Sequence, residues 1–105
     1  MNDTTFWRMD RANLSPVNNG NSLFIGVDAG KSAQDVNDDN TFIGFTAGSN
    51  TTTGGDNVAV GSLAMRNNST GYRNVAIGSD ALRNQTTGNS NVAIGFNAMK
   101  DLTIR

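Results

Sequence analysis

The chain has 105 residues, which is room for one domain at most. Only 36% of its residues are hydrophobic, 16% are charged and the formal net charge is -1, so it carries no clustered basic field of the kind that binds nucleic-acid phosphates. It contains no cysteine and no histidine, which excludes disulfides and thiolate sites and removes the commonest metal ligand and general base.

The N-terminal segment, residues 1–20, does not share the pattern of the rest of the chain. Phe6 and Trp7 are apolar, and Pro16 opens an Asn- and Gly-rich stretch that is typical of an extended segment ending in a turn. No stretch is apolar enough for a signal peptide or for the roughly 20 residues of a membrane span. Because a stack of repeats needs its open end covered, we predict a cap or connector here and a repeat domain over residues 21–105.

From residue 22 onward, a short apolar string ending in glycine returns at a fixed interval. The clearest copy is Asn74-Val75-Ala76-Ile77-Gly78. An alanine stands three residues after each glycine, and a Thr-Gly pair follows in repeats two to four. Self-similarity at a fixed short period is typical of a repeat architecture, in which each unit buries its apolar face only against its neighbours. The repeated glycines lie 18, 17, 17 and 17 residues apart, at Gly26, Gly44, Gly61, Gly78 and Gly95.

The first repeat, residues 22–39, is degenerate and one residue longer than the others. Its stretch Asp35-Val36-Asn37-Asp38-Asp39 resembles the opening of a calcium loop, in which alternating Asp and Asn oxygens point at one ion. Asn40 stands where such a loop needs glycine, and no glutamate follows. A solvated turn is therefore favoured, and we predict no metal site and no cofactor.

The later repeats, near 40–56, 57–73, 74–90 and 91–105, are better copies. Three consecutive apolar residues with β-branched ones at alternate positions favour a short buried strand, while the frequent glycines argue against helix. The Asn-rich segments supply turns. Seventeen residues fit a coil of two short strands and two turns, stacked about 4.8 Å from the next coil. The sequence thus predicts an all-β, parallel β-roll or β-solenoid with about five 17-residue coils.

The alternation within each strand assigns its sides. Ala76 is small enough for a narrow coil interior, so Val75 and Ile77 must point outward. Such a stripe of exposed apolar residues implies a partner, and the simplest partner is another copy of the chain. Stacked in register, Asn57, Asn74 and Asn91 would form a ladder of side-chain amides. The predicted stripe consists of Val58, Val60, Val75, Ile77, Val92 and Ile94.

Residues 21–99 resemble a known family of fibre repeats. The string Asn74 to Leu82, followed by Thr87-Gly88 and the next Asn91 to Gly95, is similar to the head repeats of YadA-like trimeric autotransporter adhesins. It is closer still to the longer-period repeats common in bacteriophage tail-fibre proteins. The resemblance implies left-handed coils in a homotrimeric fibre, with the apolar stripe on the threefold axis and Gly61, Gly78 and Gly95 at the turn after the inner strand. It implies an extracellular place, on a virion tail fibre or a bacterial surface.

The sequence leaves three functions open. The favoured one is a structural and adhesive segment of a trimeric fibre that presents or forms a surface touching a receptor, with a host-surface or glycan receptor as the partner. The alternative is a monomeric binding module such as an ice-binding solenoid, for which Thr53, Thr70 and Thr87 recur at the right period but only in single file. An enzyme such as a glycan hydrolase needs two facing carboxylates. Because Asp80 and Asp101 lie on different repeats, we predict no catalytic residues.

Overall fold

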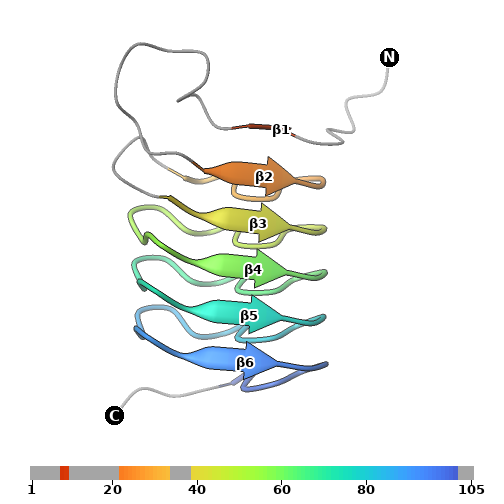
Figure 1. Cartoon of the computed structure of the whole chain (residues 1–105), viewed down its shortest axis with the longest axis vertical. Helices are drawn as coiled ribbons and strands as arrows, with labels where there is room; N and C mark the ends of the chain where they lie inside the picture. Colours follow the sequence, from red (N-terminus) through yellow and green to blue (C-terminus); the bar gives the residue numbers. More distant parts are fainter. Residues whose placement is uncertain (1–7, 10–21, 34–38, 102–105) are drawn as a thin grey trace.

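The computed structural model of the chain describes residues 8–9, 22–33 and 39–101. Its strands form one six-stranded sheet in which the order in space equals the order in the sequence (Figure 1). The strands are β1 (Arg8–Met9), β2 (Leu23–Ile25), β3 (Thr41–Ile43), β4 (Val58–Val60), β5 (Val75–Ile77) and β6 (Val92–Ile94).

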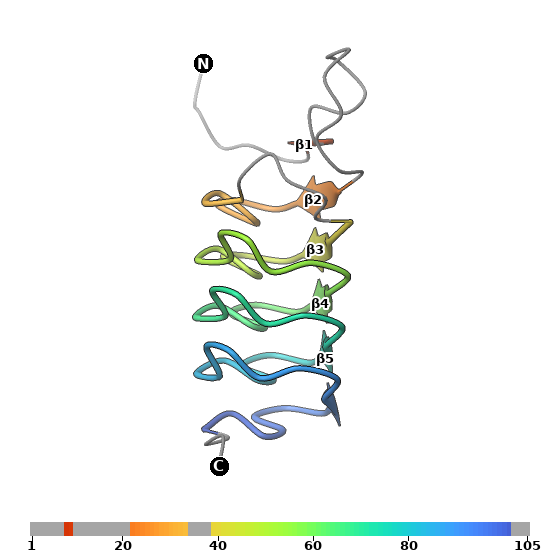
Figure 2. The ribbon, with the colours of Figure 1, turned by 90° about the vertical axis from the view of Figure 1, so that its left-hand side faces the viewer.

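The coils stack directly on one another. Strands β2 to β6 are parallel, and each residue of β4 and β5 pairs with the residue 17 places further on, as Ala59 does with Ala76. Figure 2 shows the same stacking from the side, with each coil returning to a position under its predecessor. The prediction of an all-β parallel solenoid is confirmed. The chain makes four complete turns between β2 and β6, and the fifth coil is described only as far as Asp101. The left-handed sense of the coil stays a prediction.

The prediction of two strands per coil is wrong. Each coil has one three-residue strand, and the remainder consists of turns and bends, as over residues 61–67. Positive φ angles at Leu63 (65°), Met65 (52°) and Arg73 (59°) interrupt any second extended segment. The turns nevertheless hydrogen-bond from coil to coil, since the Met65 N–H donates to the Ala81 carbonyl at 2.9 Å. Stacking therefore satisfies the backbone without a second strand.

The core is a narrow column inside the coils. The middle residue of every strand from β2 to β6 points inward, so Ala76 is fully buried as predicted. The alanine after each glycine lies in the same column, and Ala81 is fully buried. Because side chains from both sides of the coil share this column, their sizes must be matched. The buried apolar residues are Phe24, Ala29, Phe42, Ala47, Ala59, Ala64, Met65, Ala76, Ala81, Leu82 and Ala93.

Two kinds of coil fill this column in opposite ways. Phe42 points inward from β3, and the facing position in the same coil is Gly48, whose added Cβ would overlap the Phe42 ring. In the next coil Ala59 points inward from β4, and the corresponding position is Met65, which is fully buried. The large side chain therefore comes from the strand in the coil of Phe42 and from the facing turn in the coil of Met65. The two phenylalanines, Phe24 and Phe42, stack with ring centroids 5.4 Å apart.

The N-terminal segment meets the stack through β1. This strand pairs antiparallel with β2, Arg8 opposite Phe24 and Met9 opposite Leu23, at the edge of the sheet. The remainder of the predicted cap, residues 1–7 and 10–21, lies outside the described residues, as do residues 35–38 of the calcium-like stretch. Within the described ranges, no helix is long and apolar enough to cross a membrane.

Candidate functional site

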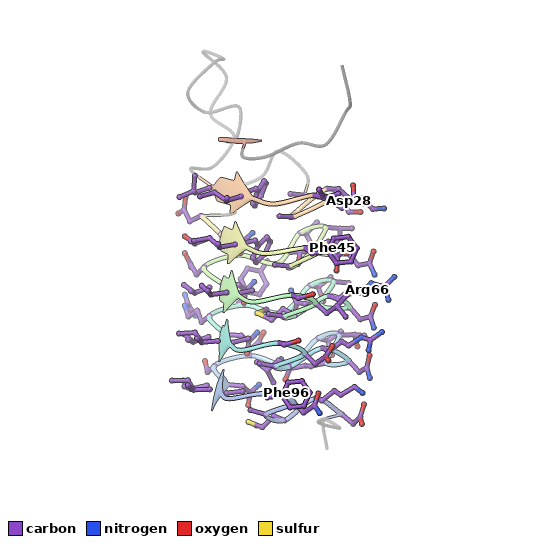
Figure 3. All side chains as sticks on the ribbon, turned by 90° about the vertical axis from the view of Figure 1, so that its right-hand side faces the viewer. Asp28, Phe45, Arg66 and Phe96 are labelled. Atoms are coloured by element: carbon purple, nitrogen blue, oxygen red, sulfur yellow. The ribbon has the colours of Figure 1, made fainter. Side chains whose placement is uncertain are left out.

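The outward-pointing residues of the parallel strands form one continuous apolar surface, which we call the outer strand face. Val58, Val60 and Val75 are partly exposed, and exposure reaches 62% at Val92 and 67% at Ile94. Figure 3 shows the side chains of this surface projecting from the strands, away from the charged groups on the other side of the coils. The predicted stripe therefore lies on one surface. Its residues are Val58, Val60, Val75, Ile77, Val92 and Ile94, continued above by Leu23, Ile25, Thr41 and Ile43.

A ladder of asparagines runs beside the strands, and we call it the inner Asn ladder (Asn40, Asn57, Asn74 and Asn91); the first three are buried and Asn91 is partly buried. Asn74 Oδ1 accepts from the backbone N–H of Asn91 at 2.9 Å and from its side-chain amide at 3.2 Å. The Asn74 amide also donates to the Gly88 carbonyl at 2.8 Å, within its own coil. The predicted ladder is thus confirmed, with backbone bonds added. Since Asn57 and Asn74 are fully buried, these residues hold the stack together and are closed to a ligand.

We expect Asn74→Ala to cost about 3 kcal/mol or more of folding free energy, because it leaves the Gly88 carbonyl and the Asn91 N–H without partners, at about 1–3 kcal/mol each. Chemical denaturation followed by circular dichroism would measure the loss. The matched control is Asn84→Ala, which removes an exposed amide from the same kind of repeat and is expected to cost about 0.5 kcal/mol. Equal losses in the two variants would contradict the structural role of the inner Asn ladder.

A second asparagine file lies on the surface on the turn side of the coils. The side-chain amide of Asn50 donates to Asn67 Oδ1 at 2.9 Å, that of Asn67 to Asn84 Oδ1 at 2.7 Å, and that of Asn84 to Asp101 Oδ1 at 2.6 Å. Each side-chain amide donates one hydrogen bond to the residue on the next coil, and the last bond ends on the Asp101 carboxylate. This file has the same 17-residue period as the strands.

Beside it runs a file of positive charges that sequence reasoning missed. Three residues that are 17 positions apart, which we call the cation file, directly precede Asn67, Asn84 and Asp101: they are Arg66, Arg83 and Lys100. At this spacing they form no cluster along the sequence. Comparing positions modulo the repeat length would have found the file, because a solenoid places residues one period apart on neighbouring coils.

Acidic residues neutralise only part of this side of the molecule. Arg83 Nη1 lies 3.5 Å from Asp80 Oδ1, and Lys31 in the first coil lies 4.0 Å from Asp28. The coil of Arg66 has Leu63 where those two coils have aspartate. Among the described residues, Arg66 therefore makes no ion pair.

Two aromatic rings are exposed at the corner that follows the strands. Phe45 is 55% exposed and Phe96 is 74% exposed, and both come directly after the corner glycine. Ser62 and Ser79 hold the same position in the two coils between them. Figure 3 shows Phe45 and Arg66 on neighbouring coils, on the side facing away from the strands. An aromatic ring and an unpaired guanidinium thus lie on the same surface.

The predicted threonine file lies at a different corner. Thr53, Thr70 and Thr87 lie in bends outside the strands. The neighbouring hydroxyls are used within the stack, since Thr52 Oγ1 donates to the Ser69 carbonyl at 3.3 Å and Ser69 Oγ to the Thr86 carbonyl at 3.4 Å. The file thus has no flat strand face around it, which is the surface that an ice-binding solenoid requires.

Asp80 and Asp101, the two carboxylates considered for a glycan hydrolase, have different surroundings. Asp80 is paired with Arg83, and Asp101 accepts from the Asn84 amide. Over residues 8–9, 22–33 and 39–101, no group of three or more Asp side chains is placed to hold a metal ion.

Comparisons of the chain with protein-family models, with curated proteins and with solved structures give no match.

Proposed function

We propose that the chain is a structural and adhesive segment of a homotrimeric fibre, exposed on a virion tail or a bacterial surface, where it presents or forms a surface that touches a receptor. The observation that carries this proposal is the outer strand face. A continuous, largely apolar surface that spans every coil from β2 to β6 is the kind of exposed patch that marks an interaction site. A second copy of the chain, with the same period, would cover it in register.

The shape of the outer strand face favours a ring of chains. Each strand offers two outward side chains, such as Val75 and Ile77 in β5. In a cyclic assembly with its axis along the stack, the Val75 column would contact one neighbour and the Ile77 column would contact the other. Such an interface closes into a ring after a few chains, and it places the same coil of each chain at the same level along the axis. Three chains is the number that the family resemblance implies.

The stack itself suits a spacer. Neighbouring coils are joined by backbone bonds in both strands and turns, as between Gly78 N–H and the Val60 carbonyl at 2.8 Å. The inner Asn ladder adds a second set of bonds along the same direction. A rod held by repeated bonds along its length resists bending, because any bend must stretch several of them at once. This property supports a role in holding or forming a contact surface at a distance.

The test is the mass of the protein in solution. Size-exclusion chromatography with light scattering should give about three times the chain mass of 11.1 kDa. The double variant Val75→Lys/Ile77→Lys places charges on the outer strand face and is expected to yield a folded monomer, because both side chains are already partly exposed in one chain.

The control is Thr70→Lys/Thr87→Lys, which places the same charges at an exposed corner away from the strands and should leave the assembly intact. Circular dichroism would confirm that both variants keep their β-structure. A wild-type protein that runs as a monomer at micromolar concentration would overturn the proposal.

A further inference from the structure

The cation file puts positive charge at equal intervals along one side of the stack. Arg66, Arg83 and Lys100 sit on successive coils, so their backbone positions are about 4.8 Å apart. Asp80 offsets the charge of Arg83, so the positive charge without an ion-pair partner among the described residues lies at Arg66 and Lys100. Such charges attract an anionic partner, and a linear partner with one negative charge per repeat unit would meet cations on several coils at once.

Arg66 is the arginine of the cation file that has no ion-pair partner among the described residues. In contrast, Asp80 lies 3.5 Å from Arg83. The exposed asparagine file beside it is occupied along its own length, as in the bond from Asn67 to Asn84. A guanidinium with free donors binds a carboxylate through two parallel hydrogen bonds. A carboxylate is therefore a partner that this surface can bind through Arg66.

The exposed ring of Phe45 adds an apolar surface on the same side of the stack, one coil away from Arg66 (Figure 3). It is 55% exposed and belongs to the coil adjacent to that of Arg66, and its carbonyl accepts from the Leu63 N–H at 2.8 Å. A flat exposed ring can lie against the apolar face of a pyranose, and a guanidinium one coil away can then reach a carboxylate carried by a sugar. Together they combine the two contacts that an acidic sugar offers.

We propose that the cation file, with Phe45, binds a linear acidic polysaccharide that carries one carboxylate on each sugar. An extended sugar residue is about as long as the spacing of coils, so one charge per sugar can meet one cation per coil. An acidic peptide fits less well. Peptides gain affinity by adding a strand to an open sheet edge or by filling a groove, and the strands β3 to β5 are paired on both sides.

This inference rests on the proposed function, since it names the chemical class of the contacted surface. In the proposed trimer the cation file would face outward, because it lies on the other side of the coils from the outer strand face (Figure 3). Three copies would then offer three parallel files. Simultaneous binding of one long polymer by several files would raise the apparent affinity above that of a single file.

The experiment is titration of the full chain with oligouronate from alginate, followed by calorimetry or by amide chemical shifts. Binding is expected, and it should weaken when NaCl is raised from about 0.05 M to about 0.5 M. Arg66→Gln should weaken it by about tenfold or more, the loss expected for a charge-assisted contact. Phe45→Ser should also weaken it, and this variant installs the residue that Ser62 and Ser79 already provide at the same corner.

The matched control is Arg73→Gln. Arg73 is an exposed cation in another part of the coil, 4.0 Å from Asp56, and its loss should leave the affinity unchanged. Absence of binding to oligouronate would overturn the inference, and so would an equal loss in Arg73→Gln. Equal binding of polyglutamate, unaffected by Phe45→Ser, would assign the surface to acidic peptides instead.

The two proposals fail separately. A trimer that binds no oligouronate would contradict the inference and leave the fibre proposal standing. A monomer that binds oligouronate through Arg66 would contradict the fibre proposal and support the site, because the whole file lies within one chain.

Discussion

Gly78→Ala is expected to destabilise the solenoid by more than about 4 kcal/mol, an effect at the extreme of single substitutions. An added Cβ would lie 2.6 Å from the Gly95 carbonyl oxygen and 2.7 Å from its carbon, both of them backbone atoms of the next coil. The φ of Gly78 is 129°, a region essentially reserved for glycine. Because β5 and β6 are paired along the same two coils, neither backbone can move away without breaking the strand pairing. Thermal and chemical unfolding would measure the effect.

Gly95→Ala separates the two causes. Gly95 has nearly the same φ, 130°, but among the described residues the nearest atom to its added Cβ is the Ala98 Cβ at 3.9 Å. Only the backbone strain remains, and the expected loss is about 1–3 kcal/mol. If the two variants lost the same stability, backbone strain alone would explain why every repeat of this chain has glycine at this corner. The close stacking of the coils would then not be the cause.

The exchange of volume between the two kinds of coil predicts a large coupling energy. Phe42→Ala should cost about 3–5 kcal/mol by leaving a cavity in the core. Gly48→Met should also destabilise strongly, because its Cβ would overlap the Phe42 ring. The double variant reproduces the Ala59 and Met65 combination of the next coil, so most of the stability should return.

A double-mutant cycle measured by chemical denaturation would give the coupling energy, which should be strongly favourable and exceed the roughly 0.5–3 kcal/mol common for neighbours. The matched reverse cycle uses Ala59→Phe with Met65→Gly, where each single change should be harmful and the pair milder. Additive effects in the first cycle would show that the two positions do not share one space. Positive φ values at both Gly48 (57°) and Met65 (52°) mean that the backbone already tolerates either residue.

Much of the fold could be predicted from the sequence because a solenoid repeats one local solution. The period placed Ala76 inside, Val75 outside and Gly78 at a turn, and all three placements agree with the burial and backbone angles. The second strand was predicted wrongly. Leu63 and Met65 have positive φ angles in this segment. Bulky residues rarely adopt positive φ, so the sequence gives no sign of this backbone conformation. Stacking on both sides imposes that conformation.

The candidate surfaces divide in the same way. The outer strand face followed from alternation along three residues, which any single strand dictates. The cation file required residues 17 apart to be recognised as neighbours, and only the structure shows that Arg83 has an acidic partner while Arg66 has none among the described residues. The exposure of Phe45 likewise depends on where the corner points.

By itself the sequence determined the period, the strand positions, the inward and outward sides and the glycine corners, because each of these follows from local sterics repeated without change. Only the tertiary structure decided that one strand suffices for a coil, that Phe42 and Gly48 share the space that Ala59 and Met65 fill differently, and which charges are neutralised. These features depend on contacts across a coil or between coils. Their energies arise from the distance between groups that the chain brings together only when it stacks.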